Sequence, residues 1–241
     1  MFKKEVMQKI SNTSSVKLIK KFINVPLVLL LLLCWSPIAT AQSGSKQKQK
    51  SRQVSAGKSW DLGAYKALYT YKTKKEIIGM GIAGSDDRVW TWYADETVSS
   101  GTSSDLEAYS SPHKYELPPD KTTKDIVGIG IAGSDDHVYV WYKDGTVSEG
   151  NTSDLDAYRS PYQYSMPAGK KPKDIVGMGI AGSNDHVYVW YKDGTVSSGS
   201  SWNLSQHRKP YPYSMPAPKT PGDIVDMGIA GSNDHVYTWY K

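Results

Sequence analysis

Cysteine and phenylalanine are nearly missing from this sequence: Cys34, Phe2 and Phe22 are the only examples. All three lie within the first 41 residues, so the rest of the chain has no disulfide to form and its fold must hold by packing. That remainder carries all 17 tyrosines and all but one of the eight tryptophans. Such rings pack on one side and hydrogen-bond on the other, which suits thin β-layers and binding surfaces.

The sequence also lacks a hydrophobic run long enough to span a membrane. The apolar stretch 25–35 is shorter than the roughly 20 residues that a spanning helix needs. Six lysines precede it, and Ala39 and Ala41 follow with one residue between them, so we predict a signal peptide over residues 1–41. We expect cleavage after Ala41 and a secreted protein, extracellular or periplasmic, with no stable membrane span. An uncleaved anchor is the alternative, and bulky Leu33 disfavours a lipoprotein built on Cys34.

No charge excess remains once the leader is removed. The leader holds six of the 29 basic and one of the 24 acidic residues, which leaves 23 of each. Segment 42–53 has four cations and no acid and is predicted to be a basic, flexible spacer, so residues 54–241 are net acidic. The folded part therefore lacks the basic footprint that nucleic-acid binding requires.

A repeat of 49 residues dominates the remainder of the sequence. Segment 124–150 recurs as 173–199 with three differences. At the same spacing, tryptophan and isoleucine align around the chain, in the rows Trp92, Trp141, Trp190, Trp239 and Ile77, Ile126, Ile175, Ile224. A period of this length indicates a repeat architecture.

Each unit is predicted to be all β. Strands are expected over 126–132, 137–142, 146–150 and 162–166, with an Asp-Gly hairpin turn after the second and a loop before the fourth. Glycines leave one face of the first strand without side chains, so that a neighbouring strand can approach it closely. Four antiparallel strands per 40–50 residues form one blade of a β-propeller, and we predict about four four-stranded blades. A linear β-solenoid is the alternative, but its coils are usually shorter.

The two ends of the repeat region are predicted to share a blade. Residues 54–71 match the outer half of a unit and residues 224–241 the inner half, while 77–120, 126–169 and 175–218 form whole blades. Pairing the two halves closes the ring and hides two sheet edges. The alternative is a dimer in which two chains together close a larger ring.

The unit's Asp-Ile start, small residues, aromatic strand and Lys-Asp-Gly turn are similar in layout to the hemopexin-like four-bladed repeat. The region 54–241 also resembles tandem-repeat propeller lectins, tectonin-like and fucose-lectin-like, whose blades carry Trp and Tyr strands and bind sugars between blades. That resemblance implies a multivalent carbohydrate-binding protein with glycans or glycoproteins as partners. The hemopexin-like layout implies a protein- or matrix-interaction module instead, and fold alone does not decide.

Two aromatic rows are the first candidate ligand-binding residues. They comprise Trp92, Tyr93, Trp141, Tyr142, Trp190, Tyr191, Trp239 and Tyr240. Each ring could form a platform for a sugar, or it could pack between blades, since both faces of a blade meet neighbours.

Polar groups on one rim are the second set. The turns ending in Asp136, Asp185 and Asp234 are expected beside the long loop with Asp154, Tyr158 and Arg159. Together they could hold sugar hydroxyls, and the competing interpretation is that the acids cap turns. In the next unit this loop changes to Asn203 and His207, and Trp202 appears, so that copy should bind differently.

Neither a metal site nor a catalytic site is predicted, and we expect no cofactor. His137, His186 and His235 fall one per blade with Arg88 in the fourth place, too far apart to converge on a metal. The acidic turns lack the spacing of a calcium loop. Catalytic motifs are missing, and the paired acids Asp86/Asp87 and Asp135/Asp136 belong to a turn that carries an aspartate in every blade, whereas an enzyme usually needs one asymmetric site. A glycan-cleaving enzyme is the third hypothesis, after lectin and interaction module.

Overall fold

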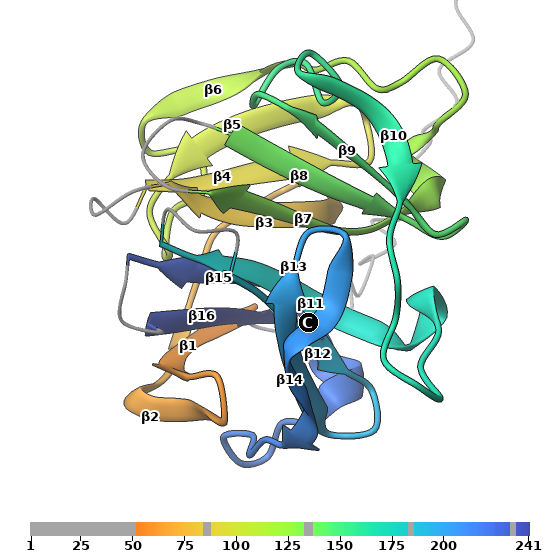
Figure 1. Ribbon diagram of the computed structural model, residues 1–241. Helices are drawn as coiled ribbons and strands as arrows, with labels where there is room; N and C mark the ends of the chain where they lie inside the picture. Colours follow the sequence, from red (N-terminus) through yellow and green to blue (C-terminus); the bar gives the residue numbers. More distant parts are fainter. Residues whose placement is uncertain (1–51, 84–87, 133–136, 183–185, 232–234) are drawn as a thin grey trace, which may run out of the picture. The chain divides into compact units, whose positions relative to one another are not determined.

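Short strands rich in β-branched and aromatic residues, separated by Gly- and Asp-containing turns, form every regular sheet of this protein. The computed structural model describes residues 52–83, 88–132, 137–182, 186–231 and 235–241. The chain divides into two units, Met1–Gln47 and Lys48–Lys241, and all described residues belong to the second. That unit is a β-propeller of four four-stranded antiparallel blades, as the repeat predicted (Figure 1).

The strands run outward from the axis in the same order in every blade. Blade 1 contains β3 (Ile77–Ala83), β4 (Arg88–Tyr93), β5 (Thr97–Gly101) and β6 (Ser110–Lys114); blade 2 contains β7 (Ile126–Ala132), β8 (His137–Tyr142), β9 (Thr146–Gly150) and β10 (Arg159–Gln163); blade 3 contains β11 (Ile175–Ala181), β12 (His186–Tyr191), β13 (Thr195–Ser200) and β14 (Asn203–Pro212); and the composite blade contains β15 (Ile224–Ala230), β16 (His235–Tyr240), β1 (Gln53–Lys58) and β2 (Asp61–Thr70).

Three short 3₁₀ helices, η1 (Thr123–Asp125), η2 (Pro172–Asp174) and η3 (Pro221–Asp223), precede the innermost strands of blades 2 and 3 and of the composite blade. None of the described segments is a helix long and apolar enough to cross a membrane.

The composite blade joins segments from opposite ends of the repeat region. Strand β16 pairs with β1, with Trp239 opposite Val54 and Tyr237 opposite Ala56. The hydroxyl groups of Ser55 and Tyr240 lie 3.0 Å apart in the same blade. The predicted closure by 54–71 and 224–241 is therefore confirmed, but the predicted spacer extended too far, because Gln53 already pairs in β1 and the Arg52 carbonyl accepts the Tyr71 amide proton at 3.0 Å.

The innermost strands of neighbouring blades pack closely because glycines remove the side chains between them. A Cβ atom at Gly128 would lie 2.4 Å from the sulfur of Met178, and one at Gly130 would lie 2.8 Å from the Ile180 side chain. This confirms the prediction that glycines leave one face of the innermost strand without side chains. Four hydrophobic clusters result, each built from two adjacent blades.

One position departs from this pattern. Blades 1 to 3 carry Gly79, Gly128 and Gly177 at the third residue of the innermost strand, whereas the composite blade carries Asp226. The Asp226 side chain is buried, and its carboxylate accepts the amide protons of Met80 at 2.6 Å and Met227 at 2.8 Å. In blades 1 to 3 the side chain of the next blade fills the space beside the glycine, whereas in the composite blade the Asp226 carboxyl group occupies this position.

The outermost strand lies earlier in the chain than predicted. In blade 2 it spans Arg159–Gln163 rather than residues 162–166. The chain leaves the blade after Tyr164, and the next amide, that of Ser165, donates to the Trp202 carbonyl of blade 3 at 2.9 Å. The sequence 164–166 therefore connects blades instead of extending the sheet.

Candidate functional site

The tryptophan row lies inside the protein. Trp92, Trp141, Trp190 and Trp239 have no exposed surface. Each indole N–H donates to a carbonyl group of the next blade; for Trp141 the acceptor is Ser201, at 2.9 Å. The rings are packed between blades, and their faces are not open to a ligand.

The tyrosine row is equally buried and is fixed within its own blade. The Tyr142 hydroxyl lies 2.9 Å from Ser148 Oγ, and that serine donates to the Leu155 carbonyl at 2.8 Å. The same arrangement recurs for Tyr93, Tyr191 and Tyr240. Burial raises the pKa of Tyr240 to about 12. These phenols anchor the third strand to the loop that follows it.

The candidate acids fall into two groups. Asp136, Asp185 and Asp234 lie outside the described residues. Asp154 accepts the amide proton of Asp156 at 3.3 Å, and Asp61, Asp105 and Asn203 make the same bond in the other blades. A bond repeated in all four blades is that of a side chain ordering its own turn.

Tyr158 and Arg159 lie on the surface, and the fold brings them beside His137, the first residue of β8. The Tyr158 and His137 ring centroids are 5.1 Å apart. Glu149 lies between two nitrogen-bearing side chains, 3.3 Å from His137 Nε2 and 3.8 Å from Arg159 Nη1. The guanidinium group of Arg159 covers the ring of Tyr162, 3.9 Å from its centroid.

We call this group the blade cluster. It lies at the end of the propeller where the third strand of each blade turns into the fourth, and we call that end the hairpin face. Equivalent pairs occur in every blade: His186 with His207 at 4.8 Å, His235 with Tyr65 at 4.9 Å, and Arg88 with Tyr109 at 5.7 Å. Lys66 covers Tyr69 at 3.8 Å and Arg208 covers Tyr211 at 3.9 Å. Each blade therefore presents aromatic rings and cationic or imidazole groups together.

Five large aromatic side chains are exposed on the hairpin face. All follow the third strand of a blade, and they are Trp60, Tyr65, Tyr109, Tyr158 and Trp202, between 46% and 56% exposed. Only Tyr158 was among the predicted site residues. The repeat alignment contained the signal, since Trp60 and Trp202 occupy the same position in their units, as do Tyr65, Tyr109 and Tyr158.

The blade clusters differ in charge. Glu149 of blade 2 is replaced by Ser100 in blade 1, by Ser198 in blade 3 and by Ala56 in the composite blade. The Glu149 carboxylate accepts a hydrogen bond from the Tyr162 hydroxyl at 2.6 Å. Burial is the main cause that raises the pKa of the Tyr162 phenol, and the contact with Glu149 is the second. Blade 2 is therefore the least cationic of the four clusters.

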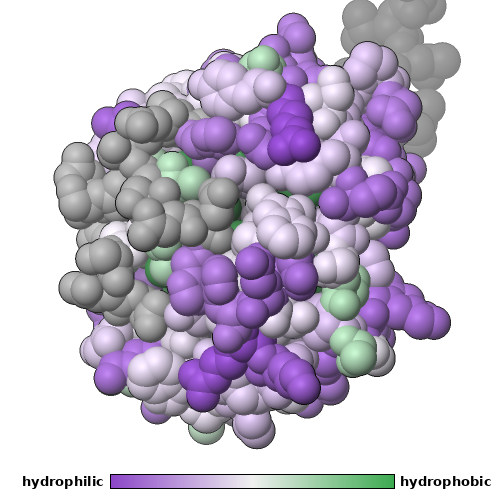
Figure 2. Space-filling model, in the orientation of Figure 1, coloured by the Kyte–Doolittle hydropathy of each residue, from purple (hydrophilic) through white to green (hydrophobic). Residues whose placement is uncertain are grey.

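All five histidines of the sequence lie in or beside these clusters. Across the described ranges, no three His, Cys, Asp or Glu side chains come together as a metal site would require. The side of the protein shown in Figure 2 is largely hydrophilic with small hydrophobic patches. The described part of the hairpin face thus presents aromatic rings, imidazoles and cations.

Comparisons with known proteins leave the family of this chain unassigned. No family model matches the sequence, and no curated protein matches it. Among solved structures, the chain is similar to PorZ, an essential bacterial surface component of the type-IX secretion system of Porphyromonas gingivalis, with 12% identity and a TM-score of 0.30. The match covers 70% of this chain and 19% of that one. The fold assignment therefore rests on the strand pairings themselves.

Proposed function

We propose that this protein is an exported, multivalent carbohydrate-binding propeller whose ligands bind at the exposed aromatic side chains and the blade clusters of the hairpin face. The observation that carries the proposal is the set of half-exposed aromatic rings, repeated around the ring beside cations and imidazoles. Binding residues commonly lie on loops that a rigid scaffold holds in place. The four blades provide that scaffold.

The chemistry of the cluster suits a sugar. An exposed indole or phenol ring packs against the apolar C–H face of a pyranose, and nearby polar groups bond its hydroxyls. Trp202 is 52% exposed, and no other ring or cation among the described residues lies against it. It is therefore the most available platform. Trp60 is similar, although Lys58 lies 5.2 Å from its ring centroid.

Repetition favours binding over catalysis. Several equal sites on one rigid ring raise the avidity for a surface that carries many copies of a sugar, without any new contact. An enzyme needs one site that differs from its neighbours, and the blade clusters are variations on one plan. We therefore propose a non-enzymatic role.

Export is a separate part of the proposal and rests on the leader 1–41 alone. N-terminal sequencing of the protein recovered outside the cytoplasm tests it. A mature chain that starts at residue 42 is the expected result. Retention of the first 41 residues on the recovered protein would contradict cleavage, though not the ring's binding role.

A glycan array probed with the purified protein and with a Trp60→Ser/Trp202→Ser double variant tests the binding role. Serine is the residue that blades 1 and 2 carry at this position, as Ser104 and Ser153, so the substitution introduces no foreign chemistry. Both rings are about half exposed, and the melting temperature should be retained. Binding to the sugars that the unmodified protein selects should fall about tenfold or more, which corresponds to about 1.4 kcal/mol.

Two results would refute the binding role. One is a folded protein that binds no glycan on the array. The other is a double variant that binds as well as the unmodified protein, which would place the ligand elsewhere on the ring. Binding of the protein to a protein bait at full strength in the absence of any glycan would favour the interaction-module hypothesis.

A further inference from the structure

The fourfold pattern is broken at one connection between blades. Five residues separate Tyr71 from Ile77, whereas ten separate Tyr115 from Ile126, and the two later connections have the same longer length. The longer connections each contain one of the 3₁₀ helices η1, η2 and η3. The short connection, all of whose residues are described, contains none.

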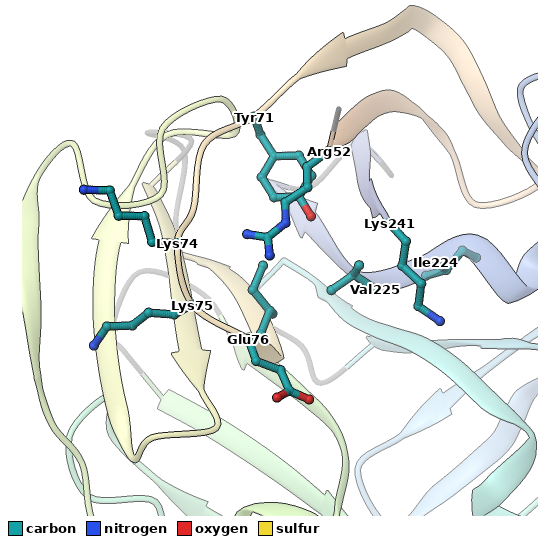
Figure 3. Close-up of a pocket in the computed structure, with 9 residues that line it drawn as sticks. Arg52, Tyr71, Lys74, Lys75, Glu76, Ile224, Val225 and Lys241 are labelled. Carbon is teal, nitrogen blue, oxygen red and sulfur yellow. The ribbon is translucent and has the colours of Figure 1, made fainter. Parts of the chain in front are cut away.

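A cavity of about 770 Å³ lies at this short connection, between the composite blade and blade 1 (Figure 3). We call it the connection groove. Arg52, Tyr71 and Glu76 line it from one side, and Ile224, Val225 and Lys241 line it from the other. Its volume falls within the range of about 300–1,000 Å³ that small-ligand sites occupy. It opens at the end of the propeller opposite the hairpin face, where the chain passes from one blade to the next.

Arg52 is the cation best placed to meet a ligand. Its Nη1 donates to the Thr73 carbonyl at 2.6 Å, and no carboxylate of a described residue lies within ion-pair distance of it. Lys75, by contrast, is already paired with Asp95 at 2.8 Å. Figure 3 shows the Arg52 guanidinium group beside the ring of Tyr71, with the Glu76 carboxylate turned away from it. The other guanidinium N–H groups of Arg52 make no hydrogen bond with a described residue, and Arg52 lines the groove.

The floor of the groove is apolar. Ile77, Ile224 and Val225 line the groove, and Ile224 and Val225 also line a second cavity of about 520 Å³. That axial cavity is bounded by Val127 and Val176, which lie one on each of the next innermost strands. Lys241 borders both cavities, and its Nζ donates to the Gly222 carbonyl at 3.2 Å. Aliphatic side chains thus line the groove at the blade junction, whereas the axial cavity beyond it has a mixed lining that also includes Lys143, Lys173 and Asp226.

We propose that the connection groove binds one amphipathic anion per ring, with a carboxylate or phosphate head against Arg52 and an apolar chain along Ile77, Ile224 and Val225. The guanidinium fork matches the geometry of a carboxylate or phosphate, and the aliphatic floor removes the chain from water. Glu76 at the far end repels a second anionic group, so the ligand carries its charge at one end. This site is independent of the sugar-binding role and lies on the other end of the propeller.

Titration of the purified protein with four probes tests the proposal: decanoate, decyl phosphate, decanol and inorganic phosphate. Decanoate and decyl phosphate should each bind, at one molecule per chain, and their relative affinities show whether the carboxylate or the phosphate head is preferred. Decanol and inorganic phosphate should bind at least tenfold more weakly, because decanol lacks the anionic head and inorganic phosphate lacks the apolar chain. Decanol binding as tightly as decanoate would overturn the proposed role of Arg52.

Arg52→Gln and Lys124→Gln make a matched pair for the same titration. Lys124 belongs to a longer connection and does not line the groove, so its change controls for net charge. Arg52→Gln should weaken decanoate binding at least tenfold, and Lys124→Gln should leave it within twofold. Equal effects of the two variants would show that only overall charge attracts the ligand, and the site would be rejected.

Grafting residues 116–125 in place of residues 72–76 provides a further variant that fills the groove. A folded graft should lose decanoate binding while keeping glycan binding at the hairpin face. A folded graft that still binds decanoate contradicts the site. If the graft does not fold, the Arg52→Gln result decides alone.

Discussion

Asp226 makes the stability of this propeller depend on pH in a specific direction. Burial raises the pKa of the Asp226 carboxyl well above its ordinary value, and the amide hydrogen bonds from Met227 and Met80 only partly offset this. A carboxyl whose pKa is raised by folding binds its proton more tightly in the native state. Its contribution to stability is therefore fully present below the unfolded pKa of about 3.9, and it is lost as pH rises through the native value.

The size of the effect follows from proton linkage. Between the unfolded and the native pKa, one group removes about 1.4 kcal/mol of unfolding free energy for every unit of pH. For a domain of this size that corresponds to about 3–6 °C in melting temperature per pH unit. The substitutions to compare are Asp226→Gly, which restores the residue of the other three blades, and Asp226→Asn, which keeps the shape of the side chain.

The assay is thermal unfolding of the three proteins between pH 4 and pH 7. Four surface carboxyls, Asp95, Asp125, Asp174 and Asp193, have pKa values lowered by hydrogen bonds from lysine or threonine side chains. Their contribution acts in the opposite direction, being lost as pH falls through their native values, and it is common to all three proteins. The difference between variant and unmodified protein therefore isolates Asp226.

Both variants should gain stability relative to the unmodified protein as pH rises from 4. The reasoning is refuted if the unmodified protein gains relative to both variants over this interval. That result would mean that the inward-facing amides of β3 and β15 stabilise the ionised carboxylate by more than burial destabilises it.

Two further predictions concern the packing between and within blades. Trp141→Phe removes the bond to the buried Ser201 carbonyl and should cost about 1–3 kcal/mol in chemical denaturation, and an unchanged midpoint would show that this bond does not hold the blades together. Gly150→Ala should cost about 3 kcal/mol or more, because the new Cβ would lie 2.0 Å from the Asp154 backbone oxygen, which no side-chain rotation relieves. At Gly194 no atom lies within 4 Å of an added Cβ, but φ is +81°. Gly194→Ala should therefore cost only about 1–2 kcal/mol in the same assay. A larger loss of stability than that of Gly150→Ala would contradict the steric argument.

The blades could be predicted from sequence because each strand has a local signal that recurs. Three of the four strands in blade 2 have the bounds that alternation and turn residues indicate. The fourth strand was placed too late because Tyr164 continues the aromatic alternation although Ser165 bonds to the next blade. That contact joins residues 37 positions apart, and no local pattern reports it.

The candidate binding surface was harder to predict because sequence does not show which rings the neighbouring blade covers. Trp141 and Trp202 are both tryptophans of a repeated unit, yet one is fully buried and the other is half exposed. The difference depends on contacts between blades rather than on the strand that carries the ring. The short connection after Tyr71, by contrast, is visible in the alignment of the units, as is Asp226 in place of glycine.

Calorimetric titration with one free sugar selected on the glycan array tests the central claim most directly. The account predicts more than one sugar per chain, weaker binding in Trp202→Ser, and tighter binding in Ser153→Trp, which adds to blade 2 the ring that blade 3 carries. A stoichiometry of one sugar per chain that neither substitution changes would contradict a ring of repeated binding sites.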